Sequence, residues 1–512
     1  DVHRLMPIAQ ADSPRAAGFF FDPPEGVFVE WLRQYLTHEN ALLLLSVTWS
    51  VYVVIVAVWI LLQRSAPVAT LSWLLSMAAI PVGGLAIYYF FGPQRLKRQR
   101  IKRLRARKTS RVRSGVQRLR ERMPGSPERL HQVARLVAAT SDFPVSTATD
   151  LRLLVGGAAT FDAIIDAVNA ARHHIHLEYY IFEPDQTGTA LRDLLIQRAR
   201  AGIQVRLLVD ALGSKKLGRR FLQPLEDAGA EVALFHGAKI GRRLRPVINF
   251  RTHRKILVCD GKVGFTGGVN VTDEENARVM PDAYHDVHLR LEGAIVNWLQ
   301  TVFLEDWAYA LEKDPKSEPA DIDLLLPDAP EGPLPVQIIT SGPDNGLQAI
   351  YRAHLAAINA AEERVWLTTP YFVPTEAALA ALTNASLRGV DVQLLVPRRS
   401  DSALVTAAAR SYYDELIRCG VRVYEYKARM LHSKTLVVDG SISIIGTANF
   451  DYRSFFLNYE VCAIAYGPQL NGDLARQFEL DLEQAQRVHF KRDLGFALRL
   501  FDSGARLCSP LL

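Results

Sequence analysis

The chain has 512 residues, of which 49% are hydrophobic and 9% aromatic. These proportions exclude disorder over most of the chain and are sufficient for a membrane segment together with two domain-sized cores. The net charge of +6 is local, because residues 95–122 carry 14 Lys or Arg and one acid while everything else sums to −7. Such a block indicates that one segment of the protein contacts an anionic surface. It argues against a basic binding surface that extends over a whole domain.

Two apolar segments are long enough to cross a bilayer, which takes about 20 residues. Residues 41–62 and 70–92 contain no charged residue, and the short connector between them predicts a transmembrane helical hairpin. The basic segment 93–125 follows directly and is placed for attraction to lipid headgroups. By the positive-inside rule it lies in the cytoplasm against the inner membrane, with residues 1–40 on the same side. Because the sequence begins on Asp1, whether residues precede it stays open.

The part of the chain beyond the basic segment is a duplication. Residues 126–313 and 336–485 alternate helices with Val-, Ile- and Leu-rich strands in the same order, and residues 314–335, rich in Pro, Asp and Glu, form a linker. This alternation predicts α/β architecture, with a mixed sheet flanked by helices in each repeat. Homologous halves usually pack about a pseudo-two-fold axis, which brings equivalent strand ends together. We therefore predict one active site shared by both repeats.

A His-x-Lys-x-x-x-x-Asp motif occurs once in each repeat. The copies are His253, Lys255 and Asp260 in the first repeat, and His432, Lys434 and Asp439 in the second. Since alternate residues of a strand share a face, the imidazole and the ammonium of each copy point to one spot. One such pair is an ordinary surface feature, but two copies at equivalent positions of a duplicated fold indicate a site.

Further polar residues repeat downstream of each motif. Asn270 and Asn449 each lie 17 residues after the motif histidine, and Asp286 occupies the place of Glu460. The asparagines add neutral donors. The two carboxylates can orient a ring nitrogen of a histidine, with the other repeat's histidine as one option, and would fix its tautomer and pKa.

This set of residues suits phosphodiester transfer without a metal. A neutral imidazole is a nucleophile toward phosphorus, and two Lys and two Asn can hold the non-bridging oxygens as charge builds. One histidine would form a phosphohistidine, while the other, protonated, would donate to the departing alcohol and then deprotonate the incoming one. We expect Asp260 and Asp439, the last residues of the motifs, to be structural anchors at the strand ends.

The paired motifs resemble those of the phospholipase D superfamily, and residues 41–512 are similar to the two-span bacterial cardiolipin synthases. The more specific similarities lie at the end of the second span, in residues 178–182, in residues 449–460 and in the tail 507–512. The resemblance implies that one phosphatidylglycerol gives its phosphatidyl group to the enzyme and that a second accepts it, which yields cardiolipin and glycerol. By analogy, His253 is the nucleophile and His432 the acid and base.

Other functions share the motifs. A phospholipase D-type lipid hydrolase would use water as the acceptor, and nothing in the motifs separates it from a transferase. A membrane-anchored nuclease would need a groove for a long polyanion, whereas the basic block is placed for lipid. A non-catalytic lipid scaffold is disfavoured because every motif residue is present. The expected partners are phosphatidylglycerol, other anionic lipids and the membrane, with no nucleic acid; a homodimer stays open.

No metal and no cofactor is predicted. His173, His174 and His176 resemble a cluster, but consecutive strand residues point in different directions, so we expect packing or surface roles. The four cysteines are scattered without zinc spacing and indicate reduced packing residues.

Two peripheral segments are amphipathic in sequence. Residues 27–36 contain Phe28, Trp31 and Tyr35 and predict a segment at the membrane surface. The C-terminal tail, residues 486–512, can form an interfacial helix or dock on the catalytic core, and the sequence does not choose between them.

Overall fold

The computed structural model describes residues 38–62, 67–80, 83, 132–141, 143–236, 250–311, 322–490, 495–507 and 509. The chain divides into two units, residues 1–94 and residues 95–512, and each is described by itself. The predicted juxtamembrane segment up to residue 37 and the basic segment 93–125 lie outside the described residues.

The first unit contains helices α2 (His38–Leu61) and α3 (Pro67–Ala79). Within α2, residues Leu42–Leu61 are long and apolar enough to cross a membrane. Its 24 residues extend about 36 Å, slightly more than the hydrocarbon core of a bilayer. Helix α3 covers the start of the second predicted span, and the rest of that span lies almost wholly outside the described residues. Val56 and Ile60 of α2 pack on Met77 of α3, so the two helices contact each other as a hairpin requires.

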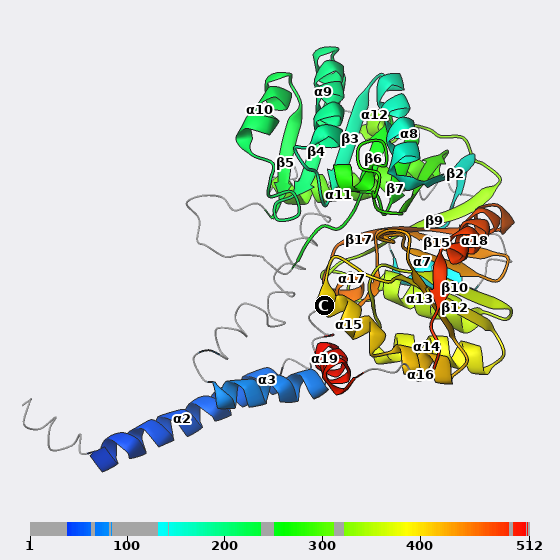
Figure 1. The fold of residues 1–512 in the computed structure, drawn as a ribbon. Coiled ribbons are helices and arrows are strands. Elements are labelled where there is room, and N and C mark those ends of the chain that lie inside the picture. The colour runs from blue at the N-terminus through cyan, green and yellow to red at the C-terminus, as the bar shows by residue number, and fades with distance from the viewer. Residues whose placement is uncertain are drawn as a thin grey trace, which may run out of the picture. The chain divides into compact units, whose positions relative to one another are not determined.

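The first repeat is built on a seven-stranded mixed sheet with the strand order β2-β8-β7-β6-β3-β4-β5. The strands are β2 (Asp150–Val155), β3 (His174–Tyr179), β4 (Gln204–Asp210), β5 (Glu231–Phe235), β6 (Ile256–Cys259), β7 (Val263–Gly267) and β8 (Val287–Glu292). β3, β4 and β5 are parallel, because α9 (Gln186–Arg200) and α10 (Arg219–Asp227) connect them, and the other pairs are antiparallel. These helices and α8 (Gly156–Ala170) cover the outer face of the sheet (Figure 1).

The second repeat has a nine-stranded sheet with the order β1-β9-β17-β15-β14-β10-β12-β13-β18. The strands are β1 (Ser146–Ala148), β9 (Leu334–Ser341), β10 (Arg364–Thr368), β12 (Asp391–Pro397), β13 (Arg422–Tyr426), β14 (Thr435–Val438), β15 (Ile442–Gly446), β17 (Glu460–Tyr466) and β18 (Ala485–Arg487). β11 (Phe372–Val373) and β16 (Phe450–Asp451) pair separately. The seven strands from β9 to β13 repeat the order of the first sheet, which is the duplicated α/β architecture expected from the sequence.

Residues 132–148, which the sequence pattern assigns to the first repeat, pack on the second. Helix α7 (Gln132–Thr140) buries Val133 and Val137 in the cluster formed by the second repeat. Strand β1 then pairs antiparallel with β9, with Ser146 opposite Val336. The reason is that β9 is left as a sheet edge, and a three-residue strand is enough to cover it.

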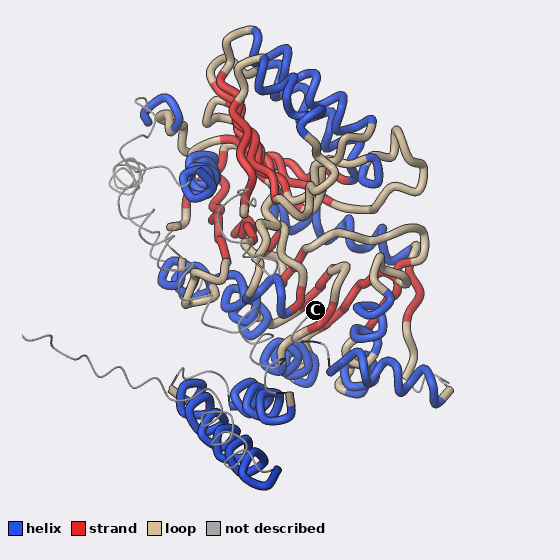
Figure 2. The backbone as a smooth tube through the Cα atoms, turned by 90° about the vertical axis from the view of Figure 1, so that its left-hand side faces the viewer, coloured by secondary structure: helices blue, strands red, loops and turns tan. Residues whose placement is uncertain are grey.

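The remaining helices complete the second unit. They are α11 (Ile295–Leu311), α12 (Ile322–Leu325), α13 (Ala349–Ala360), α14 (Glu376–Leu387), α15 (Ala403–Arg410), α16 (Tyr413–Arg418), α17 (Tyr452–Phe456), α18 (Pro468–Glu483) and α19 (Phe496–Leu507), with a 3₁₀ turn at Asp273–Glu275. Helices flank the strands in both repeats (Figure 2).

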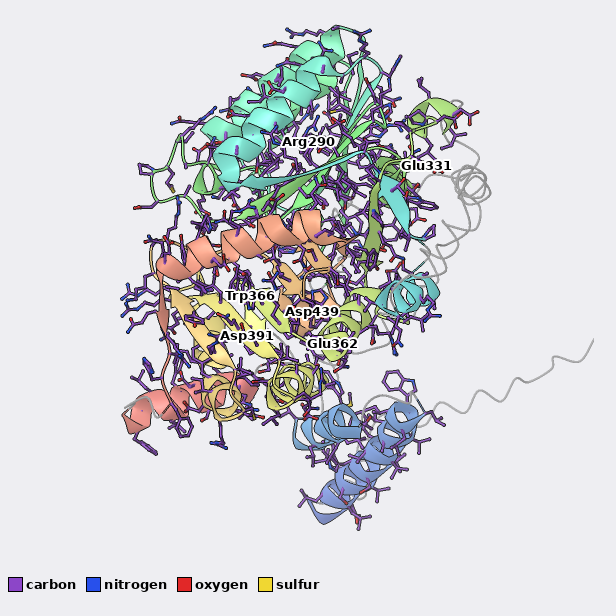
Figure 3. All side chains as sticks on the ribbon, turned by 90° about the vertical axis from the view of Figure 1, so that its right-hand side faces the viewer. Arg290, Glu331, Glu362, Trp366, Asp391 and Asp439 are labelled. Carbon is purple, nitrogen blue, oxygen red and sulfur yellow. The ribbon has the colours of Figure 1, made fainter. Side chains whose placement is uncertain are left out.

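The core between the repeats is formed by side chains from both repeats. Helices α11 and α18 occupy equivalent places, each following the strand that begins at or next to a site carboxylate, and both belong to one buried apolar cluster with the two sheets. In that cluster Phe478 of α18 stacks on Trp366 of β10, with ring centroids 5.1 Å apart (Figure 3). Because this core is continuous, the repeats form a single folded body in which strand ends from the two halves can be held in register.

Candidate active site

Two short backbone bridges join the motif strand of each repeat to the carboxylate strand of the other. Thr252 forms a parallel bridge with Tyr459, and His285 forms one with Leu431. The N–H of His253 donates to the carbonyl oxygen of Tyr459 at 2.8 Å, and the N–H of His432 donates to that of His285 at 2.8 Å. Each motif histidine is thus fixed beside the residue that precedes the other repeat's carboxylate. Both motifs and both carboxylates meet at this junction.

His253 is buried and is held by the second repeat. Its Nδ1 lies 3.0 Å from Glu460 Oε2 and 3.1 Å from the carbonyl oxygen of Thr447, whose hydroxyl also donates to Glu460. Burial lowers the pKa of His253 to about 4, and the opposing charge of Glu460 does not restore it. The ring is therefore neutral at neutral pH. With the proton on Nδ1 facing these oxygens, Nε2 carries the lone pair.

His432 is held by the first repeat and has a different charge environment. Its Nδ1 lies 2.7 Å from Asp286 Oδ2 and 3.4 Å from Glu275 Oε1. Burial and the Lys434 ammonium act to lower the pKa of His432, but the two carboxylates outweigh them and raise it above its ordinary value. The environment therefore favours the imidazolium form of His432, in contrast to His253.

Asp286 is the main cause of the raised pKa of His432, and Glu275, a residue that sequence reasoning missed, adds to it. Glu275 lies five residues after Asn270, and the residue five after Asn449 is Ser454. The Ser454 hydroxyl accepts a hydrogen bond from the backbone N–H of Asn449 at 3.1 Å and brings no charge. Comparing the repeats beyond the asparagine would have shown this difference.

The two motif lysines are fully buried beside the histidines. Lys255 Nζ donates to the carbonyl oxygen of His253 at 2.9 Å and lies 5.6 Å from the centre of the Tyr180 ring. Lys434 Nζ donates to the carbonyl oxygen of His432 and lies 3.4 Å from Asp286 Oδ2. Burial and the neighbouring Lys434 lower the pKa of Lys255 to about 7. Two buried cations that repel each other favour an anion between them, such as a phosphodiester.

Both asparagines are buried at the same junction. Asn270 Nδ2 donates to Glu275 Oε1 at 3.1 Å. The Oδ1 atoms of Asn270 and Asn449 have no hydrogen-bond partner within the described part of the chain. Leaving a buried acceptor unpaired costs free energy, so a ligand that brings a hydroxyl donor to these oxygens would be favoured.

Asp260 and Asp439 lie away from the junction. Asp260 accepts hydrogen bonds from the backbone N–H groups of residues 172–174 at 2.8 to 2.9 Å, and Asp439 does the same for residues 362–364 (Figure 3). Each has a positive φ, 56° and 51°, at the turn that ends its motif strand. Seven residues of extended chain, about 20 Å, separate Asp260 from His253. Their contacts fit the anchoring role expected for them.

One group of possible metal ligands occurs among the described residues. Atoms of Glu275, Asp286 and His432 lie within 4.8 Å of one another. However, Lys434 Nζ lies 3.4 Å from the same Asp286 oxygen, so a divalent cation there would face a buried ammonium. These residues fit a metal poorly and are better described as a charge network around one histidine. Away from this junction, His174 and His176 are buried and His173 is exposed.

Three tyrosines line the surroundings of the histidines. The ring centroid of Tyr180 lies 4.7 Å from that of His253, and those of Tyr284 and Tyr371 lie 5.7 and 6.5 Å from that of His432. None of them was singled out as a site residue from the sequence, because their positions do not correspond between the repeats.

Arg254, between the histidine and the lysine of the first motif, was also missed. It donates to the carbonyl oxygens of Glu460 and Ser341 in the second repeat and forms an ion pair with Asp306 of α11. It therefore ties the motif strand of one repeat to the carboxylate strand of the other.

Comparison with known proteins places this site in a family. A family model described as "Cardiolipin synthase, PLD-like domain" matches residues 164–307 and 354–482, more than half of the chain. The chain belongs to the cardiolipin synthase family. A second model, described as the N-terminal region of phospholipase D-nuclease proteins, matches residues 51–93.

Relatives in the cardiolipin synthase family match nearly the whole chain. The cardiolipin synthase of Geobacillus sp. (strain WCH70) is 39% identical over 487 residues, covering 91% of this chain and 94% of that protein. Cardiolipin synthase 1 of Bacillus anthracis is 36% identical over 480 residues, with the same coverage. These matches confirm the prediction that the chain is a phospholipase D-type cardiolipin synthase. Such an enzyme is a phosphatidyltransferase and a membrane protein.

A solved structure shows the same fold. Phosphatidylserine synthase of Haemophilus influenzae Rd KW20 superimposes with a TM-score of 0.56, at 14% identity, over 75% of this chain and 100% of that one. The cardiolipin synthase family member described here therefore has the two-repeat phospholipase D-like fold.

Proposed function

We propose that the protein makes cardiolipin by transferring the phosphatidyl group of one phosphatidylglycerol to a hydroxyl of a second, with release of glycerol. Membership of the cardiolipin synthase family supports the overall reaction. The unequal environments of His253 and His432 support the assignment of roles, and this difference is the observation on which the mechanism depends.

In the first step His253 is the nucleophile. Its Nε2 lone pair attacks phosphorus, the P–N bond forms, and the P–O bond to the departing glycerol breaks. Positive charge develops on the ring as the bond forms, and Glu460, 3.0 Å from Nδ1, stabilises it. His432, held as an imidazolium by Asp286 and Glu275, gives a proton to the glycerol oxygen.

In the second step the same groups act in reverse. His432, now neutral, takes the proton of the second phosphatidylglycerol's hydroxyl, and the oxygen attacks phosphorus while the bond to His253 breaks. One phosphodiester replaces another, so no external energy source is required. The enzyme returns to its starting protonation state.

The lysines and asparagines stabilise charge on the phosphoryl oxygens in both steps. Lys255 and Lys434 supply buried cations, and the Nδ2 groups of Asn270 and Asn449 supply N–H donors. Removing one fixed donor of this kind typically costs a factor of about 10² to 10³ in rate.

We propose a multi-pass arrangement in which the predicted hairpin anchors the catalytic unit on the cytoplasmic face of the inner membrane. The apolar length of α2 and the basic residues that follow the second predicted span support it. The substrates are then the anionic lipids of the inner leaflet, phosphatidylglycerol first among them.

Product analysis tests the reaction. With phosphatidylglycerol vesicles we expect cardiolipin and glycerol in equal amounts; phosphatidic acid as the main product would show that the protein is a lipid hydrolase. Plasmid cleavage would indicate a nuclease.

Trapping tests the roles of the histidines. A phosphatidyl ester of p-nitrophenol has a leaving group that needs no acid, so we expect His432→Ala to accumulate a covalent phosphatidyl-enzyme and His253→Ala to form none. A covalent adduct that survives loss of His253 would reverse the assignment.

A further inference from the structure

The C-terminal helix α19 has one docked face and one apolar face without a partner in the described residues. Asp502 and Ala505 are buried against the second repeat, and Arg506 lies over the ring of Tyr412 and 3.4 Å from Glu415. On the outward side, Phe496 is 81% exposed and Leu500 62% exposed.

Four of the five exposed large apolar residues of α19 fall on one arc, and the fifth, Leu498, lies outside it. Successive residues of a helix are rotated by about 100°, so Phe496, Leu500, Phe501 and Leu507 lie within an arc of about 140°. That arc contains no charged residue, and Phe501 and Leu507 are 51% and 84% exposed. The charged residues Asp502 and Arg506 lie on the docked side. A helix that merely covered the core would direct its large apolar residues inward.

The docked face of α19 contacts the wall of the active site. Ala505 packs in a cluster with Val373 of β11 and with Ala407 and Ala408 of α15. Two residues before Val373 is Tyr371, whose ring lies 6.5 Å from that of His432.

The loop that begins α15 holds this tyrosine. The Tyr371 hydroxyl donates to Asp401 at 2.7 Å, and Ser402 then caps α15. Helix α19 is therefore connected to the surroundings of His432 through β11 and α15, and in Figure 1 it borders α15 in the second repeat.

We infer that the exposed face of α19 inserts into the surface of the bilayer and seats the active site against it, so that a lipid diester passes from the membrane to the histidines over β11. The partner is a lipid surface because the arc combines Phe and Leu without charge, and because the same chain carries an apolar helix long enough to span a bilayer. The inference deepens the proposed function and rests on it for the route of the substrate.

Site-directed spin labelling of the full-length protein in nanodiscs of phosphatidylglycerol and phosphatidylethanolamine tests insertion without catalysis. Cys259 and Cys462 are buried and do not react, so Cys419→Ser and Cys508→Ser give a suitable background. The label is placed by Leu500→Cys, with Leu480→Cys on α18 as the matched control, since Leu480 is 50% exposed.

We expect oxygen, which concentrates in lipid, to relax the label at position 500 more than a water-soluble nickel chelate does, and the reverse at position 480. Equal access of the chelate to both positions would overturn the inference.

Activity supplies a second readout. Burial of a Leu or Phe side chain is worth a factor of about ten or more, so Leu500→Ser with Phe501→Ser should lower cardiolipin formation from bilayer phosphatidylglycerol by at least about tenfold. Turnover of short-chain phosphatidylglycerol below its micellar concentration should be unchanged, as should both activities of Leu480→Ser. Equal losses on both substrates would show that α19 is only structural. If the unaltered protein forms no cardiolipin at all, the proposed function fails, whereas the spin-label result still decides insertion.

Discussion

Replacing Glu275 by Gln keeps the size of the side chain and an acceptor for Asn270 but removes the charge 3.4 Å from His432 Nδ1. A unit charge about 4 Å from an imidazolium is worth about 4 kcal/mol at an effective dielectric constant of 20. Even a third of that value changes a pKa by about one unit. The Glu275 carboxylate raises the pKa of His432, so its loss lowers this pKa. In the variant, the imidazolium of His432 therefore loses its proton at a lower pH.

The alkaline limb of the pH profile of kcat/KM reports loss of a proton from His432 or from Lys255, whose pKa of about 7 Glu275 also raises. We therefore expect this limb to move down by at least about one pH unit in Glu275→Gln. The acidic limb reports His253, whose pKa is about 4, and should not move. The assay is cardiolipin formation from phosphatidylglycerol in mixed micelles over the accessible pH range. Asp282→Asn, which neutralises an exposed carboxylate of the same segment, is the control. An alkaline limb that stays in place, in a variant with unchanged thermal unfolding, would refute this account of the asymmetry.

Three further substitutions probe the support of the site. A Cβ at Gly268 would overlap the carboxylate that holds the second motif histidine, so Gly268→Ala should lower kcat by about a hundredfold or more, whereas Gly472→Ala, in open space on α18, should keep full activity. Arg254→Met removes the guanidinium that forms an ion pair with the buried Asp306 of α11 and should cost about 3 to 5 kcal/mol of stability, measured by denaturant unfolding, against about 1 kcal/mol for Ser433→Ala at the equivalent position. Asp260→Asn removes the charge of a carboxylate that accepts hydrogen bonds from three backbone N–H groups, so it should lower the unfolding temperature. The kcat of this variant at a permissive temperature should stay within about threefold. A large loss of kcat in the folded variant would contradict the anchoring role of Asp260.

The repeat pattern was sufficient to predict the α/β halves and the meeting of the two motifs, because strand periodicity and the duplication can both be read from the sequence. From the sequence, the pairing of each carboxylate with the histidine of the other repeat was only one option. It depends on the parallel bridges at Thr252 and at His285, which are contacts between segments nearly 150 residues or more apart. No periodicity encodes such a pairing.

The roles of other residues also depend on contacts that form only in the folded protein. Strand β1 joins the second sheet because β9 offers an open edge, and this is a property of the folded sheet. Glu275 acts on His432 from the other repeat, so its role follows from the packing of the two halves. In the sequence Glu275 follows two other acids, Asp273 and Glu274, so nothing distinguished it from its neighbours.

The differences between the repeats also bear on how a substrate is oriented. In a site with perfect two-fold symmetry, a diester could bind in either of two opposite senses, and either histidine could attack. Here Gly268, Glu275 and Asp286 on one side face Thr447, Ser454 and Glu460 on the other. With the roles proposed for the two histidines, these differences give the junction a polarity in which the departing glycerol lies toward His432. A duplicated fold whose halves differ at these positions can then bind its diester in one orientation.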